Sequence, residues 1–134
     1  MHQETLSKAV ELANRLGHVF VATADAEGLP HVAAAGSLEL ISPDQVSVSS
    51  WFCPTTTDNI ERNPRIALVI WDRENDVGYQ LLGKTSLPRD TAIMDGFSPE
   101  LEQKGAIPQV EWRLLVHVNN IIAFSHAPHS DKEE

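Results

Sequence analysis

The chain of 134 residues carries ten Lys and Arg against nineteen Asp and Glu, a formal net charge of −9. With this balance and no basic run, we expect no nucleic-acid partner. The length fits one domain, residues 1–134, and the single cysteine, Cys53, excludes an internal disulfide. No apolar stretch approaches the roughly eighteen residues of a membrane span and no export signal begins the chain. We therefore expect a soluble cytoplasmic protein with no membrane segment.

The first part of the chain predicts one helix followed by three strands. Apolar residues at helical spacing before Gly17 predict an amphipathic helix over residues 1–16: Leu6, Ala9, Val10, Ala13 and Leu16. A β-branched run, a turn at residues 25–30 and a second extended run predict a hairpin, and strict alternation predicts a further strand. The predicted strands in this part are residues 18–24, 31–41 and 46–52.

The second part of the chain predicts further strands with helical segments between them. Extended segments at residues 65–72 and 79–86 are followed by one or two short helices within residues 89–104. Residues 112–118 and 121–125 read as a closing pair around Asn119-Asn120, and residues 126–134 as a frayed polar tail. Short strands at near-regular spacing predict a mainly β fold, a six-stranded antiparallel barrel with one helix before the strands and further short helices inserted late.

The segment at residues 53–64, CPTTTDNIERNP, reads as a short helix whose start is crowded with polar side chains. One interpretation is capping: Asp58 with Glu61 forms a capping box, or Thr57 caps instead, worth about 0.5–2 kcal/mol relative to alanine. The other is an anion site, because hydroxyls and free N–H groups at a helix start bind phosphate. Its residues are Thr55, Thr56, Thr57 and Asn59. The residues alone leave both interpretations open.

A run of small residues, Ala33-Ala34-Ala35-Gly36, lies inside a predicted strand. Small residues give up β-propensity and packing area, which requires a physical reason. Either a ligand lies against this backbone, or a helix or another strand packs tightly on it.

Four segments in order resemble the split-barrel flavoproteins related to pyridoxamine 5′-phosphate oxidase, closest in proportions to their small single-domain members that bind flavin mononucleotide (FMN). They are VFVATADAEGLPHVAAAGSL, SVSSWF, TTTDNIERNPRIALVIWD and VGYQLLGKTS. The resemblance spans about residues 17–125, and its most specific part is residues 59–68 followed by Gly83. It implies a six-stranded antiparallel split β-barrel of Greek-key type, with an N-terminal helix and short inserted helices.

The resemblance also implies a homodimer with two FMN sites, each between subunits. It places the phosphate at the segment before Asn59, and makes Gln80 a further lining candidate. Trp112 stands where close relatives bring an aromatic residue from the second subunit toward the flavin. The residues implied for the ring and ribityl neighbourhood are Ala33, Ala34, Ala35, Ser50 and Trp51.

One departure from the family pattern concerns the phosphate. Family members that bind FMN commonly place a Lys or Arg in the phosphate segment, where this chain has Thr55 or Thr56. Replacing a charged hydrogen bond with a neutral one weakens affinity by about tenfold. The hydroxyls and the helix start offset part of this loss, and the nearest cations along the chain are Arg62 and Arg65.

The residues identify no catalytic group, substrate or redox partner. We find no nucleophile with its base, no paired carboxylates and no histidine spacing that selects a metal, so we expect no metal site. A flavin carries its own chemistry, so the expected function is an FMN-dependent oxidoreductase or electron-transfer protein. The alternatives are a binding module for haem, a deazaflavin or another ligand, and a dimeric domain with a vestigial site.

Overall fold

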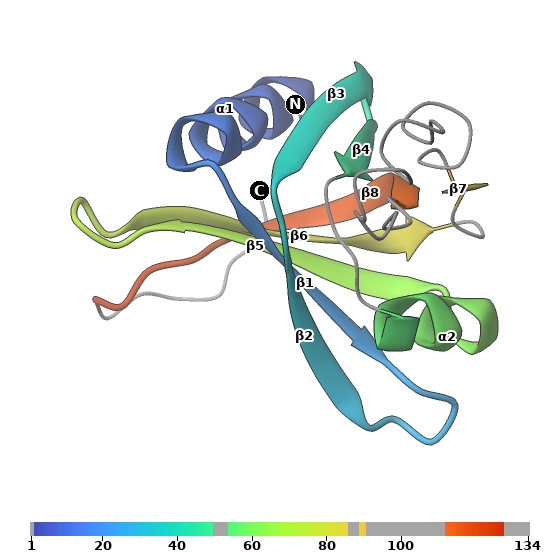
Figure 1. Ribbon diagram of the computed structural model, residues 1–134. Coiled ribbons are helices and arrows are strands. Elements are labelled where there is room, and N and C mark those ends of the chain that lie inside the picture. The colour runs from blue at the N-terminus through green and yellow to red at the C-terminus, as the bar shows by residue number, and fades with distance from the viewer. Residues whose placement is uncertain (1, 50–53, 86–88, 91–111, 128–134) are drawn as a thin grey trace, which may run out of the picture.

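The computed structural model describes residues 2–49, 54–85, 89–90 and 112–127, and Figure 1 shows their arrangement. Most of the helical segment predicted within residues 89–104 lies outside the described residues, as does the tail after residue 127. The elements in chain order are α1 (His2–Leu16), β1 (Val19–Ala24), β2 (Pro30–Ala35), β3 (Ser37–Ser42), β4 (Gln45–Ser49), α2 (Pro54–Arg62), β5 (Arg65–Asp72), β6 (Val77–Thr85), β7 (Arg89–Asp90) and β8 (Trp112–Ala123).

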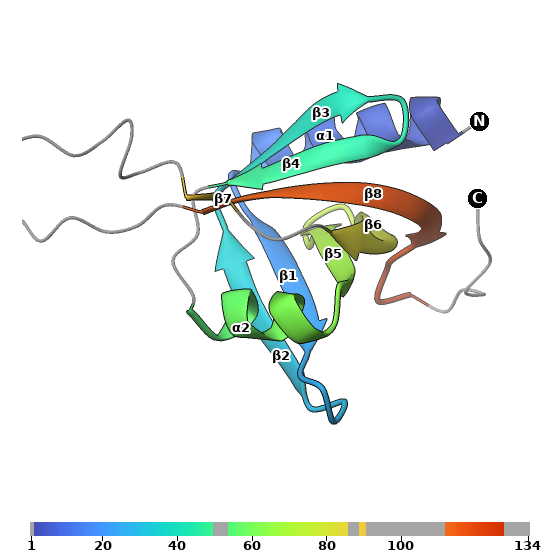
Figure 2. The ribbon, with the colours of Figure 1, turned by 90° about the vertical axis from the view of Figure 1, so that its right-hand side faces the viewer.

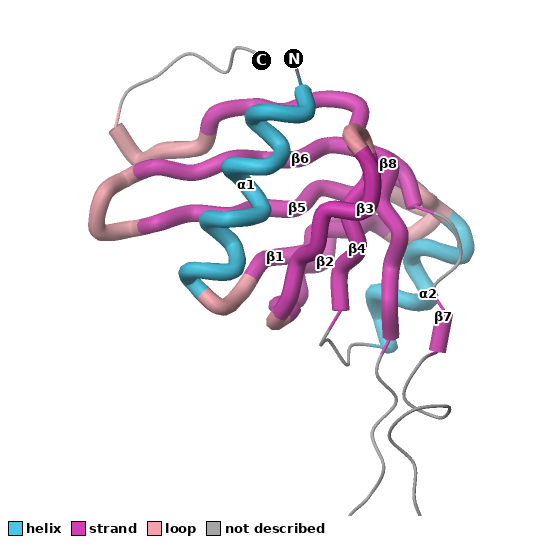
Figure 3. Tube along the Cα trace, turned by 90° about the horizontal axis from the view of Figure 1, so that it is seen from above, coloured by secondary structure: helices cyan, strands magenta, loops and turns pink. Residues whose placement is uncertain are grey.

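Seven strands follow one another in an antiparallel sheet in the order β2-β1-β5-β6-β8-β4-β3, and β7 pairs with β8 outside this path. Strands β2 and β3 lie at opposite ends of the order, although only Gly36 separates them in the chain. The sheet must therefore curl until its two ends meet, as Figures 1 and 3 show. The predicted mainly β, antiparallel split barrel is confirmed.

The strand count differs from the predicted six. The predicted strand at residues 31–41 is two strands, because the chain turns at Gly36 from one end of the sheet to the other. The predicted closing pair around Asn119-Asn120 is wrong, since β8 is one continuous strand of 12 residues. Its pairing with β6 shifts register between Leu82 and Gly83, so the two asparagines mark a β-bulge rather than a turn.

Helix α1 forms over almost the predicted range and lies across the inner face of the sheet (Figure 3), where it packs against β3 and β5. It ends at Gly17, whose φ of 81° is left-handed and whose N–H donates to the Ala13 carbonyl at 2.8 Å. No helix among the described residues is long and apolar enough to cross a membrane. The buried apolar residues of α1 are Leu6, Ala9, Val10, Leu12 and Ala13.

The core under α1 is built from consecutive cross-strand partners. Val21 pairs with Leu68, Leu68 with Leu81, and Leu81 with Ile121, which gives one row across β1, β5, β6 and β8. All four side chains are buried, and burying each contributes about 1.5–3 kcal/mol. Because side chains alternate along a strand, the neighbouring residues point to the outer face of the same sheet.

The turn between β5 and β6 ties down the chain after β8. Asp76 has a left-handed φ of 52°, and its carboxylate accepts hydrogen bonds from the His126 N–H at 2.7 Å, the Ala127 N–H at 2.9 Å and Trp71 Nε1 at 3.0 Å. These donors, the His126 N–H first, lower the pKa of Asp76 below its ordinary value. The first two residues of the predicted tail are therefore anchored to the barrel.

Candidate functional site

Helix α2 carries the predicted anion-binding residues and begins earlier than the sequence indicates. It runs from Pro54 to Arg62, so the three threonines lie in its first turn rather than ahead of it. Proline suits the first helical position, since it has no N–H that needs a partner and its φ is preset. The predicted capping box is therefore wrong, because Asp58 lies inside the helix and does not precede it.

Two of the threonine hydroxyls are buried and have no partner in the part of the chain that the structure describes. Thr56 is 0% exposed and Thr57 is 8% exposed, and neither Oγ1 has a hydrogen-bond partner among the described residues. Burying a hydroxyl without a hydrogen bond costs about 1–3 kcal/mol, so such groups call for a ligand or a water. Thr55 is exposed. The start of α2 thus offers two unused hydroxyls beside the free N–H groups of its first turn.

Asn59 holds α2 against the sheet. Its Nδ2 donates to the Thr23 Oγ1 at 3.1 Å, and both side chains are buried. Figure 2 shows α2 beside β1 and β2, at the end of the barrel away from α1. Asn59 therefore fixes α2 against β1, and its partner Thr23 is a residue that sequence reasoning missed. The strong strand pattern around Thr23 gave no signal of this role.

The three alanines of β2 do not share one face. Ala35 is buried in the core, Ala33 lies on the same inner side opposite Val21, and Ala34 is exposed on the outer side opposite Phe20. Strand β2 also forms one end of the strand order, so one of its edges has no partner strand among the described residues. A ligand beside β2 would thus meet its backbone edge and only some of the three methyl groups.

Of the remaining predicted site residues, Gln80 lies away from the start of α2, and the side chains of the other three lie outside the described part of the chain. Gln80 lies on β6, between Val69 and Ile122 by register, on the outer face of the sheet. Trp112 opens β8 opposite Asp90, and its side chain is outside the described part of the structure. Ser50 and Trp51 also lie outside the described residues. Among the described residues of one chain, the structure therefore places Thr56, Thr57 and Asn59 of α2 beside β1 and β2.

Comparison with known protein families identifies the family of the chain. The family model described as pyridoxamine 5′-phosphate oxidase matches residues 6–118, which include every described element except the outermost ends. The chain belongs to the pyridoxamine 5′-phosphate oxidase family. The resemblance drawn from the ordered segments is confirmed.

Individual relatives of this family member are distant. A protein of Methanocaldococcus jannaschii, uncharacterized protein MJ0282, is 29% identical over 98 residues, which cover 66% of this chain and 65% of that protein. A general stress protein 26-related protein of Clostridium acetobutylicum has a TM-score of 0.68 at 17% identity, covering 99% of this chain and 96% of its own. An FMN-binding protein of Syntrophomonas wolfei has a TM-score of 0.67 at 17% identity, covering 96% and 91%. At these identities the solved structures show the shared fold.

The departure from the family pattern stands out in the structure. Arg62 lies in the last turn of α2, where a cation is favoured by the helix dipole, and Arg65 opens β5 beyond that end. Neither lies at the helix start, and no described Lys or Arg falls in the first turn of α2. An anion held there would rest on N–H groups and hydroxyls. Among the described residues, no group of His, Cys, Asp or Glu is arranged to hold a metal ion.

Proposed function

We propose that this protein binds FMN and acts as a flavin-dependent oxidoreductase or electron-transfer protein. The observation that carries the proposal is the pair of buried hydroxyls of Thr56 and Thr57 in the first turn of α2, which have no partner among the described residues. In a member of the pyridoxamine 5′-phosphate oxidase family, an anionic cofactor is the natural partner for these groups. A similar fold in a protein named as FMN-binding supports the choice of flavin.

The described residues fit the phosphate end of a flavin. The two hydroxyls and the N–H groups of the first turn of α2 would bind the phosphate, and the bond between Asn59 and Thr23 fixes the helix that presents them. The free edge of β2, with its small side chains, would border the rest of the cofactor. When bound, FMN supplies the redox chemistry, while the protein supplies position, electrostatics and exclusion of water.

Removing the buried hydroxyls should weaken FMN binding without harming the fold. Hydrogen bonds to a charged group contribute about 1.5–3 kcal/mol, so Thr56→Val or Thr57→Val should weaken FMN affinity by about tenfold to a hundredfold. Without FMN, each variant should be as stable as the parent or more stable, because a methyl group replaces a buried hydroxyl that has no partner. Quenching of FMN fluorescence and urea unfolding measure the two effects.

The control for this experiment is Thr5→Val, which makes the same exchange on α1, far along the chain from α2. It should leave FMN affinity unchanged. Equal effects of Thr5→Val and Thr56→Val on FMN affinity would show that the phosphate does not bind at the start of α2. A protein that stays colourless and does not quench FMN at about 100 μM would overturn the cofactor itself, and a Soret band with added haemin or uptake of a deazaflavin would then favour another ligand.

We further propose that the protein works as a homodimer, whose second subunit covers the outer face of β1 and β2. Phe20 is 38% exposed and Val32 is 62% exposed on this face, and Ala34 lies beside Phe20 by register. Gln80 points to the same outer face. A flavin site formed between two subunits at this face would therefore include Gln80.

A charge placed on this face should separate the subunits. Burying an unpaired carboxylate costs several kcal/mol, so Val32→Glu should shift the sedimenting species from twice to once the mass of the chain. Val77→Glu, on an exposed valine at the far end of β6, should keep the dimer. A parent protein that sediments as a monomer at micromolar concentration would refute the dimer.

A further inference from the structure

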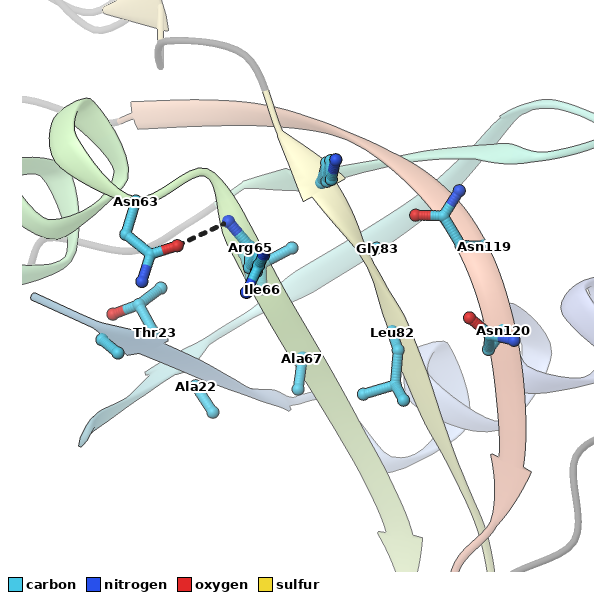
Figure 4. Close-up of a pocket in the computed structure, with 12 residues that line it drawn as sticks. Ala22, Thr23, Asn63, Arg65, Ile66, Ala67, Leu82, Gly83, Asn119 and Asn120 are labelled. Carbon is cyan, nitrogen blue, oxygen red and sulfur yellow. Dashed lines mark hydrogen bonds between the residues drawn. The ribbon is translucent and has the colours of Figure 1, made fainter. Parts of the chain in front are cut away.

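A groove of about 490 Å³ lies on the outer face of the sheet, where β1, β5, β6 and β8 run side by side (Figure 4). This volume is within the roughly 300–1,000 Å³ of small-molecule sites. Its floor is the row Ala22, Ala67 and Leu82, which are direct partners across β1, β5 and β6. Two small side chains side by side leave an apolar hollow that larger residues would fill. Polar side chains surround this floor: Asn63, Arg65, Lys84, Asn119 and Asn120.

Two cations face each other at the groove. Arg65 and Lys84 are direct partners across β5 and β6, and both are exposed. Like charges directly opposite each other destabilise a sheet. Neither forms an ion pair with a carboxylate of the described residues; the next partner in the row, His117, lies 3.5 Å from Asp44. Among the described residues, no carboxylate neutralises this pair of cations, which makes them a candidate site for an anion from outside.

The β-bulge turns two neighbouring amides toward the same groove. In a regular strand Asn119 and Asn120 would point to opposite faces. Here Leu82 pairs with Asn120 and Gly83 with Val118, so Asn119 is the extra residue, and both asparagines line the groove (Figure 4). Bulges re-aim side chains and occur beside binding sites more often than elsewhere. The amides thus add hydrogen-bonding groups beside the two cations.

We propose that this groove binds a small molecule carrying an oxyanion, either a carboxylate or a phosphate ester, on an apolar body. The oxyanion lies between Arg65 and Lys84, where charge-assisted bonds remove their repulsion, and the body lies on the alanine floor. The groove reaches Asn63 just beyond the end of α2, whereas the proposed phosphate site is at the start of the helix; Thr23, which anchors α2, also lines the groove. The proposal does not depend on FMN binding.

Calorimetric titration of the full chain with phenyl phosphate, benzoate and inorganic phosphate tests the groove. We expect saturable binding of phenyl phosphate or benzoate, the better of the two identifying the oxyanion, and weaker binding of inorganic phosphate, which lacks the body. The double variant Arg65→Gln/Lys84→Gln should weaken binding by about tenfold or more. The control Lys8→Gln/Arg73→Gln removes the same charge at remote exposed positions and should have little effect.

A second variant tests the contribution of the apolar floor independently of the two cations. Ala67→Leu fills the hollow and should reduce binding of phenyl phosphate while leaving that of inorganic phosphate unchanged. Thr56→Val should leave both unchanged, so a failure of the flavin site and a failure of the groove give different results. The proposal is overturned if no ligand binds saturably at millimolar concentration, or if the two double variants lose equal affinity. It is also overturned if Arg65→Gln/Lys84→Gln changes the sedimenting mass, because the groove would then be part of a subunit interface.

Discussion

The Gly83→Ala variant is expected to lose about 3 kcal/mol or more of its free energy of unfolding. A Cβ at residue 83 would overlap the carbonyl oxygen of His117, and would lie 2.9 Å from its carbonyl carbon and 3.2 Å from the Cα of Val118. These atoms are backbone atoms of β8, so they cannot rotate away. Strands β6 and β8 would have to separate at the bulge, which breaks pairing on both sides. Urea unfolding followed by tryptophan fluorescence measures the loss.

Gly17→Ala is the matched control for this variant. Gly17 has a left-handed φ of 81° but no atom within 4 Å of a Cβ placed on it. The substitution should therefore cost only the left-handed strain of about 1–2 kcal/mol. A loss at residue 83 no larger than the loss at residue 17 would show that the close approach of the two strands is not what requires glycine there.

The fold was predictable where local pattern and tertiary structure agree. The spacing of Leu6 to Leu16 predicted α1, because it reflects one buried face, while β-branched or apolar runs and, at residues 46–52, alternation predicted the strands. The errors lie where the chain keeps its extended form but changes partner. Gly36 reads as one small residue among several, yet it passes the chain from one end of the sheet to the other. Asn119-Asn120 reads as a turn because asparagine favours turns, whereas pairing with β6 makes it a bulge.

The candidate site also has features that the sequence predicts and features that it does not. The three threonines were predicted just ahead of a short helix, and they lie in the first turn of that helix. The burial of Thr56 and Thr57 was not predictable, because it depends on where α2 meets β1 and β2. The pairing of Arg65 with Lys84 was equally hidden, because a register between strands is set by the whole sheet and a shift of one residue would turn a side chain to the other face.

Strand alternation lets one sheet serve both proposed sites. Thr23 anchors α2 and also lines the groove, and its neighbour Ala22 forms part of the groove floor. Likewise Leu68 belongs to the buried row and its neighbour Ala67 to the groove. The proposed phosphate site and the groove thus share one layer of strands, and the buried row between β1 and β8 holds that layer in shape. Loss of the row should disturb both sites, whereas a change in one site should leave the other intact.

Leu68→Ala is therefore expected to reduce the free energy of unfolding by about 2–5 kcal/mol, because it leaves a cavity between Val21 and Leu81 under α1. Leu68 is 0% exposed, and its neighbours are held in strands that cannot collapse into the space. The control Leu29→Ala makes the same exchange at a residue that is 68% exposed in the turn between β1 and β2, and should cost less than about 0.5 kcal/mol. Urea unfolding gives both values, and equal values would show that the row is not the centre of the core.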